Sequence, residues 1–429
     1  MNKLYLMCFY ESNVRYFHLA KSLFEKKGCE IVILCMYPSA VKYCKKNELK
    51  YVYLPKEVRK EEYSKKIDID SSYYSFHTTL LPSLEKEYIK VSAFYFNYYE
   101  QLLKSDFFYS LIVIGDIRLF SSTAKYWANK LNKKIFYFEP GAFSTMIFDP
   151  VGVNKNMSIS QDTLEYIESY EVNNELLEEF LAPLSGRKYY EGNFGAYFRK
   201  IKDVLLSVPP EFMRSSFPCE LQTGEGLFES IPYLFSRLIS GGSKSEKVAI
   251  PEKFILFPLQ VPNDVQIIEN SPNFESITDM VKAVGENLPE GYKVLVREHP
   301  MNKGRYDKAL YDYLNSHPDV ILDNDNYLFE LIDKSDLVVI NNSTVGVEAL
   351  KTDTEVLVLG ESYYHQVVHC YDKTKNIKDV IEDAIKNPIS RELKDKFLTL
   401  IFEKYLVKDN YKNKTYLNLD KMVNKLTEL

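Results

Sequence analysis

The run of residues 338–350, VVINNSTVGVEAL, constrains the fold more than any other part of the chain. An apolar stretch stops at two asparagines and two hydroxyl residues, and a helical pattern follows at once. A strand that turns directly into a helix points free backbone N–H groups, and the positive end of the helix dipole, at one spot. The pattern therefore predicts an α/β unit with a site that favours a phosphate group.

Several side chains of this turn are candidate nucleotide ligands. Ser343 or Thr344 would cap the helix or bond a phosphate oxygen, and Asn342 and Gly346 belong to the same turn. Glu348 lies early in the helix, where its carboxylate would accept two hydroxyls of a ribose. An ordinary capped helix after a buried strand explains the same residues, so both interpretations stay open at this point.

Two neighbouring segments end in the same manner. Residues 292–300, YKVLVREHP, end in charge, imidazole and proline, and residues 355–364, EVLVLGESYY, reach a turn at Gly360. Parallel α/β sheets bind ligands at the carboxyl ends of their strands. The three strands therefore predict one ligand site at that edge of a sheet.

These blocks resemble the nucleotide half of the bacterial capsule-polysaccharide synthesis family. That family contains the β-Kdo transferases and related enzymes that use CMP-activated 3-deoxy-ulosonic acids. Residues 255–268, ILFPLQVPNDVQII, resemble the family's strand and Gln-Val-x-x-Asp turn, which here includes Gln260. Residues 136–154, FYFEPGAFSTMIFDPVGVN, resemble its Glu-x-Gly segment with a downstream Asp-x-x-Gly-Val-Asn. The first 110 residues and residues 158 to about 250 match no motif of the family.

The fold class expected is α/β and GT-B-like, with two Rossmann-like domains, helical insertions and a C-terminal helical tail. Strands alternate with helices in each half, which is typical of parallel sheets. The predicted strands of the first half span residues 4–9, 30–36, 51–54, 109–114 and 134–138, and helices are expected at 14–27, 39–47 and 122–132.

The alternation divides the chain into three parts. We expect an acceptor-side domain at 1–245 with a helical insertion, and a CMP-sugar-binding domain at 250–372. A helical tail at 373–429 would close the two domains. Residues 57–108 and 158–245 have helical patterns, and SGGSKSEK at 240–247 is typical of a linker.

Composition excludes several classes of protein. A net charge of −6 argues against a general nucleic-acid binder. Six cysteines without a Cys-x-x-Cys pair indicate a reducing compartment. The chain contains no apolar run of about 18 residues, and its first apolar run is too short for a signal peptide. We expect a cytoplasmic protein, either free or peripheral to the inner membrane.

Asp264 is the first candidate for catalysis. The resemblance to the β-Kdo transferases makes it the match for a carboxylate nucleophile in a double displacement, a role in which a carboxylate attacks the anomeric carbon and later leaves. The sequence Pro-Asn-Asp is also a good turn, with Asp264 as the cap of the following helix.

His299 and Arg297 are the cationic candidates. They lie two residues apart, so along a strand they would face the same side and suit a phosphate or a sugar carboxylate. Pro300 disfavours helical geometry at His299, so the strand must end there. The alternative is an interior histidine bonded to backbone.

Glu139 is the candidate general base of the first half. It stands between an aromatic strand and a Pro-Gly turn, and a solvated strand-end carboxylate is the competing interpretation. Pro140 stands where relatives have an acidic or amide residue. Asp149 and Asn154 are expected to shape a loop, and Gly115-Asp116 follows a strand and would line the acceptor side.

No metal or other cofactor is expected, because a helix terminus and cations can neutralise the single phosphate of a CMP donor. The Asp-x-Asp patterns at 68–70 and 323–325 lie in charged connectors. The resemblance implies transfer of a 3-deoxy-ulosonic acid, Kdo first, from CMP to a hydroxyl of a surface glycan or glycolipid. The alternatives are another CMP-nonulosonic acid (sialic, pseudaminic or legionaminic type) and a non-catalytic capsule-assembly subunit. The expected partners are the CMP-sugar donor, the acceptor, and the inner membrane or capsule-assembly proteins.

Overall fold

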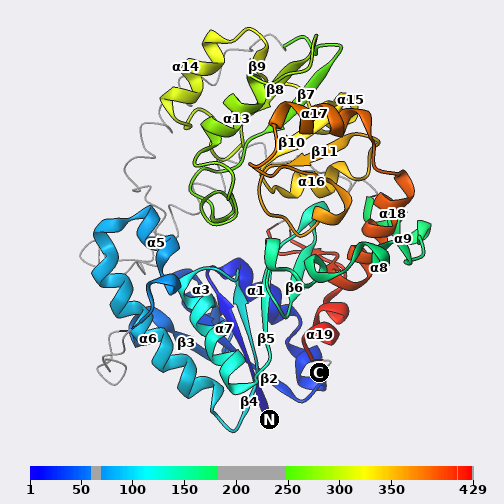
Figure 1. Cartoon of the computed structure of the whole chain (residues 1–429). Coiled ribbons are helices and arrows are strands. Elements are labelled where there is room, and N and C mark those ends of the chain that lie inside the picture. The colour runs from blue at the N-terminus through cyan, green and yellow to red at the C-terminus, as the bar shows by residue number, and fades with distance from the viewer. Residues whose placement is uncertain (59–68, 182–247, 413, 428–429) are drawn as a thin grey trace. The chain divides into compact units, whose positions relative to one another are not determined.

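The computed structural model describes residues 1–58, 69–181, 248–412 and 414–427 (Figure 1). The described residues form two compact units. Unit 1 comprises residues 1–158 and 404–427, and unit 2 comprises residues 159–181 and 248–403. The helices expected between 182 and 245 and the linker at 240–247 lie outside the described residues.

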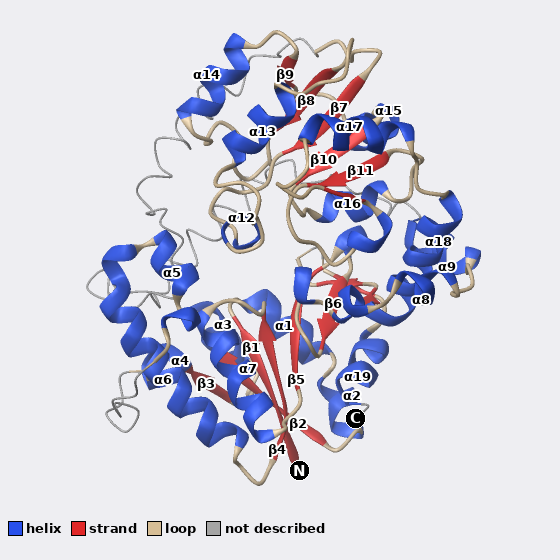
Figure 2. Ribbon diagram, in the orientation of Figure 1, coloured by secondary structure: helices blue, strands red, loops and turns tan. Residues whose placement is uncertain are grey.

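Unit 1 is built on a seven-stranded sheet of order β13-β6-β5-β4-β1-β2-β3, shown as red arrows in Figure 2. Its strands are β1 (Asn2–Cys8), β2 (Cys29–Cys35), β3 (Tyr51–Tyr53), β4 (Phe108–Ile114), β5 (Ile135–Pro140), β6 (Met146–Asp149) and β13 (Leu406–Val407). The first five strands pair in parallel, and β6 pairs antiparallel with both β5 and β13. The tail of the chain therefore supplies an edge strand.

Helices cover both faces of this sheet. They are α1 (Glu11–Leu19), α2 (Lys21–Lys26), α3 (Pro38–Lys46), α4 (Leu54–Glu57), α5 (Ser75–Leu80), α6 (Glu85–Leu103), α7 (Leu119–Leu131) and α19 (Leu419–Thr427). Alternate residues Leu4, Leu6 and Cys8 of β1 share one core with side chains of α1, α2, α3 and α19. Helices α6 and α7 pack against each other, and α7 also packs on β5. The segment between β13 and α19 forms a short hairpin of β14 (Asp409–Asn410) and β15 (Thr415–Tyr416).

The single helix predicted at 14–27 is wrong, because the chain forms α1 and α2 with a break at Ala20. The backbone N–H of Ala20 bonds the carbonyl of Phe17, which tightens the turn. Leu19 is exposed, so it does not belong to the apolar stripe that suggested a continuous helix.

Unit 2 contains a six-stranded parallel sheet of order β12-β11-β10-β7-β8-β9. Its strands are β7 (Phe254–Pro258), β8 (Lys293–Arg297), β9 (Val320–Leu322), β10 (Leu337–Ile340), β11 (Glu355–Val358) and β12 (His369–Cys370). Its helices are α8 (Leu164–Glu168), α9 (Asn174–Leu181), α12 (Val265–Ile268), α13 (Ile277–Gly285), α14 (Lys308–Ser316), α15 (Leu328–Lys334), α16 (Thr344–Ala349), α17 (Ile377–Lys386) and α18 (Arg391–Leu400).

The strands of unit 2 read as apolar runs because both faces of the sheet are covered. Alternate residues Ile255, Phe257 and Leu259 enter one core with helices α13, α14 and α17. Helix α16 packs against β10 and β11. The predicted α/β class with two Rossmann-like units is thereby confirmed. No helix in the described ranges is long and apolar enough to cross a membrane.

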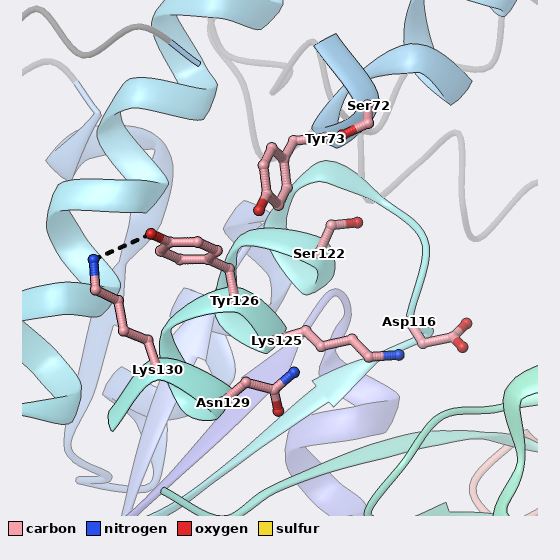
Figure 3. Close-up of a pocket in the computed structure, with 8 residues that line it drawn as sticks. All are labelled: Ser72, Tyr73, Asp116, Ser122, Lys125, Tyr126, Asn129 and Lys130. Atoms are coloured by element: carbon pink, nitrogen blue, oxygen red, sulfur yellow. Dashed lines mark hydrogen bonds between the residues drawn. The ribbon is translucent and has the colours of Figure 1, made fainter. Parts of the chain in front are cut away.

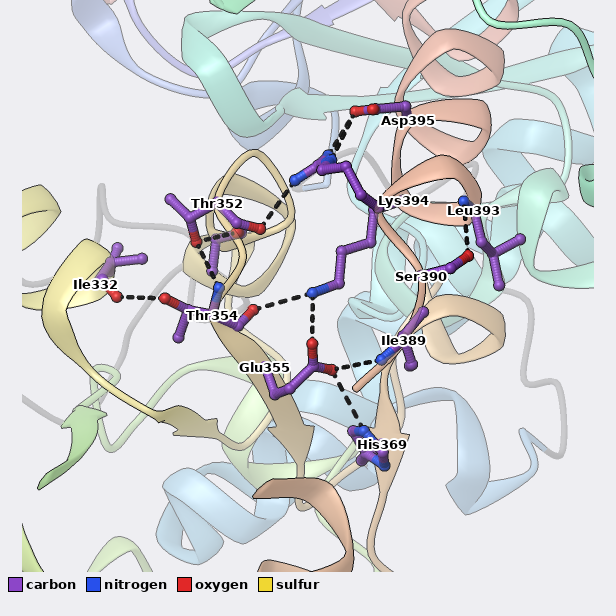
Figure 4. A network of polar contacts seen from close by, with 12 residues as sticks. Ile332, Thr352, Thr354, Glu355, His369, Ile389, Ser390, Leu393, Lys394 and Asp395 are labelled. Atoms are coloured by element: carbon purple, nitrogen blue, oxygen red, sulfur yellow. Dashed lines mark hydrogen bonds and ion pairs between the residues drawn. The ribbon is translucent and has the colours of Figure 1, made fainter. Parts of the chain in front are cut away.

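A buried ion pair fastens α18 to the sheet of unit 2 (Figure 4). Lys394 donates to Glu355 Oε1 at 2.7 Å and to the carbonyl of Thr354 at 3.2 Å. His369 Nε2 lies 3.3 Å from Glu355 Oε2, to which the backbone N–H of Ile389 also donates. Burial favours the neutral form of Glu355, but the contacts from His369 and Lys394 hold the pKa of its carboxyl below its usual value.

We expect Lys394→Ala to destabilise the protein by about 3 kcal/mol, because it leaves the carboxylate of Glu355 buried without its main partner. Lys386→Ala is the matched control, since Lys386 pairs with Glu382 on the exposed surface of α17 and its loss should cost less than about 0.5 kcal/mol. Urea unfolding of both variants measures the difference. Equal midpoints for the two variants would contradict the structural role of the pair.

Candidate functional site

The carboxyl edge of the unit 2 sheet gathers most of the residues singled out in the sequence. The parallel register pairs Pro258 with Arg297, and Ile340 with Val358. Strands β7, β8, β10 and β11 therefore end together, and their following segments leave the sheet at one edge. Gln260 and Asp264 follow β7, His299 follows β8, Asn342 and Ser343 follow β10, and Gly360 follows β11.

Gln260 and Asn342 form a reciprocal pair of hydrogen bonds across this edge, which we call the Gln260–Asn342 clasp. The side-chain amide of Gln260 donates to Asn342 Oδ1 at 3.0 Å, and its Oε1 accepts from the backbone N–H of Asn342 at 3.1 Å. The Asn342 amide also donates to the carbonyls of Gln266 and Asn270. Gln260 and Asn342 therefore fix the segments after β7 and β10 to each other, and their hydrogen bonds are used within the protein.

Gly346 and Gly360 allow close packing. A Cβ at Gly346 would lie 2.4 Å from Ile340 Cδ1 and 2.7 Å from the Tyr364 hydroxyl. A Cβ at Gly360 would lie 2.3 Å from Asn341 Oδ1. Both glycines were predicted as nucleotide contacts, and the structure gives each a packing reason that needs no ligand.

The start of α16 is held from two directions. Ser343 Oγ accepts from the backbone N–H of Val345 at 3.2 Å, so Ser343 is the helix cap. The Tyr364 hydroxyl donates to the carbonyl of Ser343 at 2.6 Å. Thr344 follows at the first helical position and is half-buried.

Glu348 lies inside unit 2 rather than at its surface. Glu348 is 6% exposed, so its side chain is less accessible than that of a residue that binds a ribose at a helix surface would be. Burial first, and then the carboxylate of Glu348, raise the pKa of the Tyr363 phenol, so the two side chains are neighbours.

His299 is oriented by the loop that follows β8. Its Nδ1 accepts from the backbone N–H of Met301 at 3.2 Å, and the backbone N–H of His299 donates to the Tyr306 hydroxyl at 3.0 Å. A ring whose Nδ1 accepts carries its proton on Nε2 when neutral. That tautomer presents a donor and suits contact with an anionic oxygen.

Arg297 is the last residue of β8, whereas His299 lies in the segment that follows. Strand β8 ends at Arg297, so the alternation that would place both side chains on one face stops before His299. The Arg297 guanidinium donates to the carbonyl of Asn326 at 2.6 Å. Burial lowers the pKa of Arg297, while Asp323 and Asp325 oppose that shift.

Two residues of this edge were missed by the sequence analysis. The Tyr306 hydroxyl accepts from His299 and donates to the carbonyl of Gln260 at 3.0 Å, so it joins the ends of β7 and β8. Glu298 accepts from the Gly304 N–H, the Tyr311 hydroxyl and the Asn324 amide. An acidic residue between Arg297 and His299 was a visible signal for Glu298, whereas nothing local in the sequence distinguishes Tyr306.

Asp264 is an exposed residue at this edge. It caps α12, and its Oδ1 accepts from the backbone N–H of Gln266 at 2.9 Å. The cap uses one carboxylate oxygen and leaves the other for contact with a ligand. The structure therefore makes Asp264 the helix cap and keeps its carboxylate accessible.

A second polar group occupies the carboxyl ends of β4 and β5 in unit 1. Glu139 Oε2 accepts from the Asn154 amide at 3.1 Å, and Asn154 has a left-handed backbone with φ of 55°. Asp116 Oδ2 accepts from the Asn156 amide at 2.7 Å and from the backbone N–H of Val153. Burial raises the pKa of Asp116, an effect that these hydrogen bonds oppose. A carboxyl with a raised pKa suits a general base.

Asp149 shapes the loop that carries Asn154 and Asn156. It is fully buried and accepts from the backbone N–H groups of Val151, Gly152 and Ser158. Among the described residues, no group of three or more His, Cys, Asp or Glu side chains could hold a metal ion.

The comparison with protein families matches the part of the chain that contains the unit 2 sheet. Residues 241–411 match the family model described as "Capsule polysaccharide biosynthesis protein". This part of the chain is therefore similar to the capsule polysaccharide biosynthesis family. Protein FixF of Sinorhizobium fredii is 31% identical over 189 residues, which cover 40% of this chain and 42% of FixF. The chain thus spans less than half of the length of this relative.

The comparison with solved structures finds two similar chains of low sequence identity. The Thermosulfurimonas dismutans KpsC β-Kdo 2,7 transferase is 13% identical with a TM-score of 0.43, covering 100% of this chain and 99% of that one. The S. aureus MnaA–UDP structure is 13% identical with a TM-score of 0.33, covering 92% of this chain and 90% of that one.

Gly346→Ala and Thr344→Ala separate packing from ligand contact at the start of α16. We expect Gly346→Ala to destabilise the protein by about 1–3 kcal/mol, because the added methyl group meets Ile340 and Tyr364. Thr344 is the half-buried first residue of α16, so Thr344→Ala should change the unfolding free energy by less than about 0.5 kcal/mol. Denaturant unfolding measures both, and a Gly346→Ala protein as stable as the parent would contradict the packing role.

Proposed function

We propose that the chain is a glycosyltransferase that moves a 3-deoxy-ulosonic acid, Kdo first, from a CMP donor to a hydroxyl of a surface glycan or glycolipid. One observation carries the proposal. The carboxyl edge that assembles Asp264, His299 and the start of α16 lies within the residues that match the capsule family. Ligands of parallel α/β sheets bind at that edge.

The donor phosphate would bind between His299 and the start of α16. The Nε2 proton of His299 and the hydroxyl of Thr344 supply donors, and a charge-assisted hydrogen bond is stronger than a neutral one. The single phosphate of CMP needs little countercharge, so no metal or other cofactor is part of the proposal. The clasp between Gln260 and Asn342 would keep these groups in place before the donor arrives.

Asp264 would act as the nucleophile of a double displacement. Its carboxylate attacks the anomeric carbon, the bond from that carbon to the phosphate oxygen breaks, and CMP leaves with the electron pair. The acceptor hydroxyl then attacks the same carbon, loses its proton to a base, and Asp264 leaves as a carboxylate. Glu139 is the base that we propose for the proton, and two displacements retain the configuration of the sugar.

CMP should stabilise the protein against heat. A ligand present at about 100 times its dissociation constant adds about 2.7 kcal/mol to the unfolding free energy. Melting curves with CMP, UMP and UDP test the preference for the nucleobase and for the number of phosphates together. The melting temperature should rise most with CMP, less with UMP and not with UDP. Stronger protection by UDP than by CMP would overturn the donor assignment.

Asp264→Asn tests the nucleophile without removing the helix cap, because asparagine caps helices as well as aspartate does. The variant should melt and bind CMP as the parent does but lose transfer. The parent protein, incubated with CMP-Kdo and no acceptor, should gain the mass of one sugar within residues 254–268. An active Asp264→Asn protein with an inverted product and no adduct would leave a single displacement, with Asp264 as a cap only.

A further inference from the structure

Glu298 is a buried carboxylate at the carboxyl edge of the unit 2 sheet, and the proposed reaction assigns it no part. It stands between Arg297, the last residue of β8, and His299, and it is 6% exposed. Burying a carboxylate costs free energy unless hydrogen bonds compensate for the lost water. The groups that donate to Glu298 therefore indicate what its side chain holds in place.

Both carboxylate oxygens of Glu298 close one loop. Oε1 accepts from the backbone N–H of Gly304 at 2.8 Å and from the Tyr311 hydroxyl, and Oε2 accepts from the Asn324 amide at 2.6 Å. Asn324 returns the contact, because its Oδ1 accepts from the backbone N–H of Glu298 at 3.0 Å. The carboxylate therefore ties the far end of the loop 299–304 to the end of β8 and to the segment after β9.

A tight turn fills the loop between these anchors and holds the His299 ring. The backbone N–H of Asn302 donates to the carbonyl of His299 at 2.8 Å, and that of Met301 donates to His299 Nδ1 at 3.2 Å. Gly304 ends the turn with φ of 76°, a left-handed backbone that glycine adopts without strain. The imidazole is therefore held by its own loop, and the loop is held by Glu298.

We propose that Glu298 is the positioning residue of His299. Its carboxylate keeps the loop closed, and the closed loop brings the Met301 N–H to Nδ1 of the imidazole. An Nδ1 that accepts a hydrogen bond is unprotonated, so the neutral ring presents Nε2–H as a donor. That this donor meets a nucleotide phosphate rests on the proposed function, whereas the orientation of the ring does not.

Glutamine cannot replace this acid without loss. A glutamate accepts at both oxygens, whereas a glutamine accepts at one and presents an NH₂ group at the other position. In Glu298→Gln that NH₂ group would face either the Asn324 amide or the donors from Gly304 and Tyr311. The substitution keeps the size of the side chain and loses at least one hydrogen bond, so it loosens the loop without creating a cavity.

The nitrogen NMR spectrum of protein with isotope-labelled histidine tests this orientation without any substrate. At about pH 8 an ordinary imidazole is neutral, and a ring nitrogen then resonates far apart in its protonated and unprotonated forms. In the parent, the Nδ1 resonance of His299 should lie at the unprotonated position. In Glu298→Gln it should move toward the protonated position, because a released ring exchanges between both tautomers. His299→Ala identifies the signal among the six histidines of the chain.

Lys394→Ala is the matched control. It also takes a partner from a buried carboxylate of unit 2, but that carboxylate, Glu355, begins β11 at the opposite edge of the sheet. The control should lose stability and leave the His299 resonance in place. A resonance that stays in place in Glu298→Gln, or that moves as far in Lys394→Ala, would overturn the proposal. Should Glu298→Gln fail to fold, Tyr311→Phe removes one donor from the acid, and an unmoved resonance there overturns the proposal equally.

Release of CMP from CMP-Kdo tests whether Glu298 acts through His299. Glu298→Gln should lower kcat/KM about tenfold, the factor that about 1.4 kcal/mol produces, and it should have no further effect in a protein that already carries His299→Ala. Effects that multiply in the double variant would place the action of Glu298 elsewhere and overturn the proposal. A parent protein that releases no CMP would refute the proposed function, while the NMR result would still decide what positions His299.

Discussion

The reciprocal pair of hydrogen bonds between Gln260 and Asn342 is the constraint on which the candidate donor site depends. Parallel strands bring the segments after β7 and β10 to one edge, where each segment leaves the regular strand. The clasp joins them directly, and the side-chain amide of Asn342 also donates to the carbonyls of Gln266 and Asn270. The turn that carries Asp264 is therefore positioned by the segment that follows β10, the neighbour of β7 in the sheet.

The same edge is held on its other side by hydroxyl groups. Tyr306 joins the ends of β7 and β8, and Tyr364 holds the start of α16. Both phenols are buried, and burial raises their pKa values, so they remain neutral donors over the physiological range. A site held by neutral hydrogen bonds keeps its geometry as pH changes.

Sequence reasoning found the elements of the site better than the roles of its residues. Strand ends, the turn after β10 and the cap at Asp264 follow from local patterns, because apolar runs, helix caps and X-Pro steps act over a few residues. Gln260, Asn342, Gly346 and Gly360 were predicted to contact the nucleotide. The structure gives each a partner within the protein, and those partners lie up to 82 residues away in the chain. No local pattern contains such a contact.

The amino-acid sequence by itself determined the α/β class, the parallel sheets and the edge at which polar residues collect, because side-chain periodicity and turn chemistry are local properties. The tertiary structure decided which of those polar groups are used up by the fold and which remain for a ligand. It also placed Tyr73 in one pocket with Lys125 and Tyr126 of α7, which belong to a different element of the chain (Figure 3). That pocket exists only because separate elements pack together, and packing partners are set by the whole core.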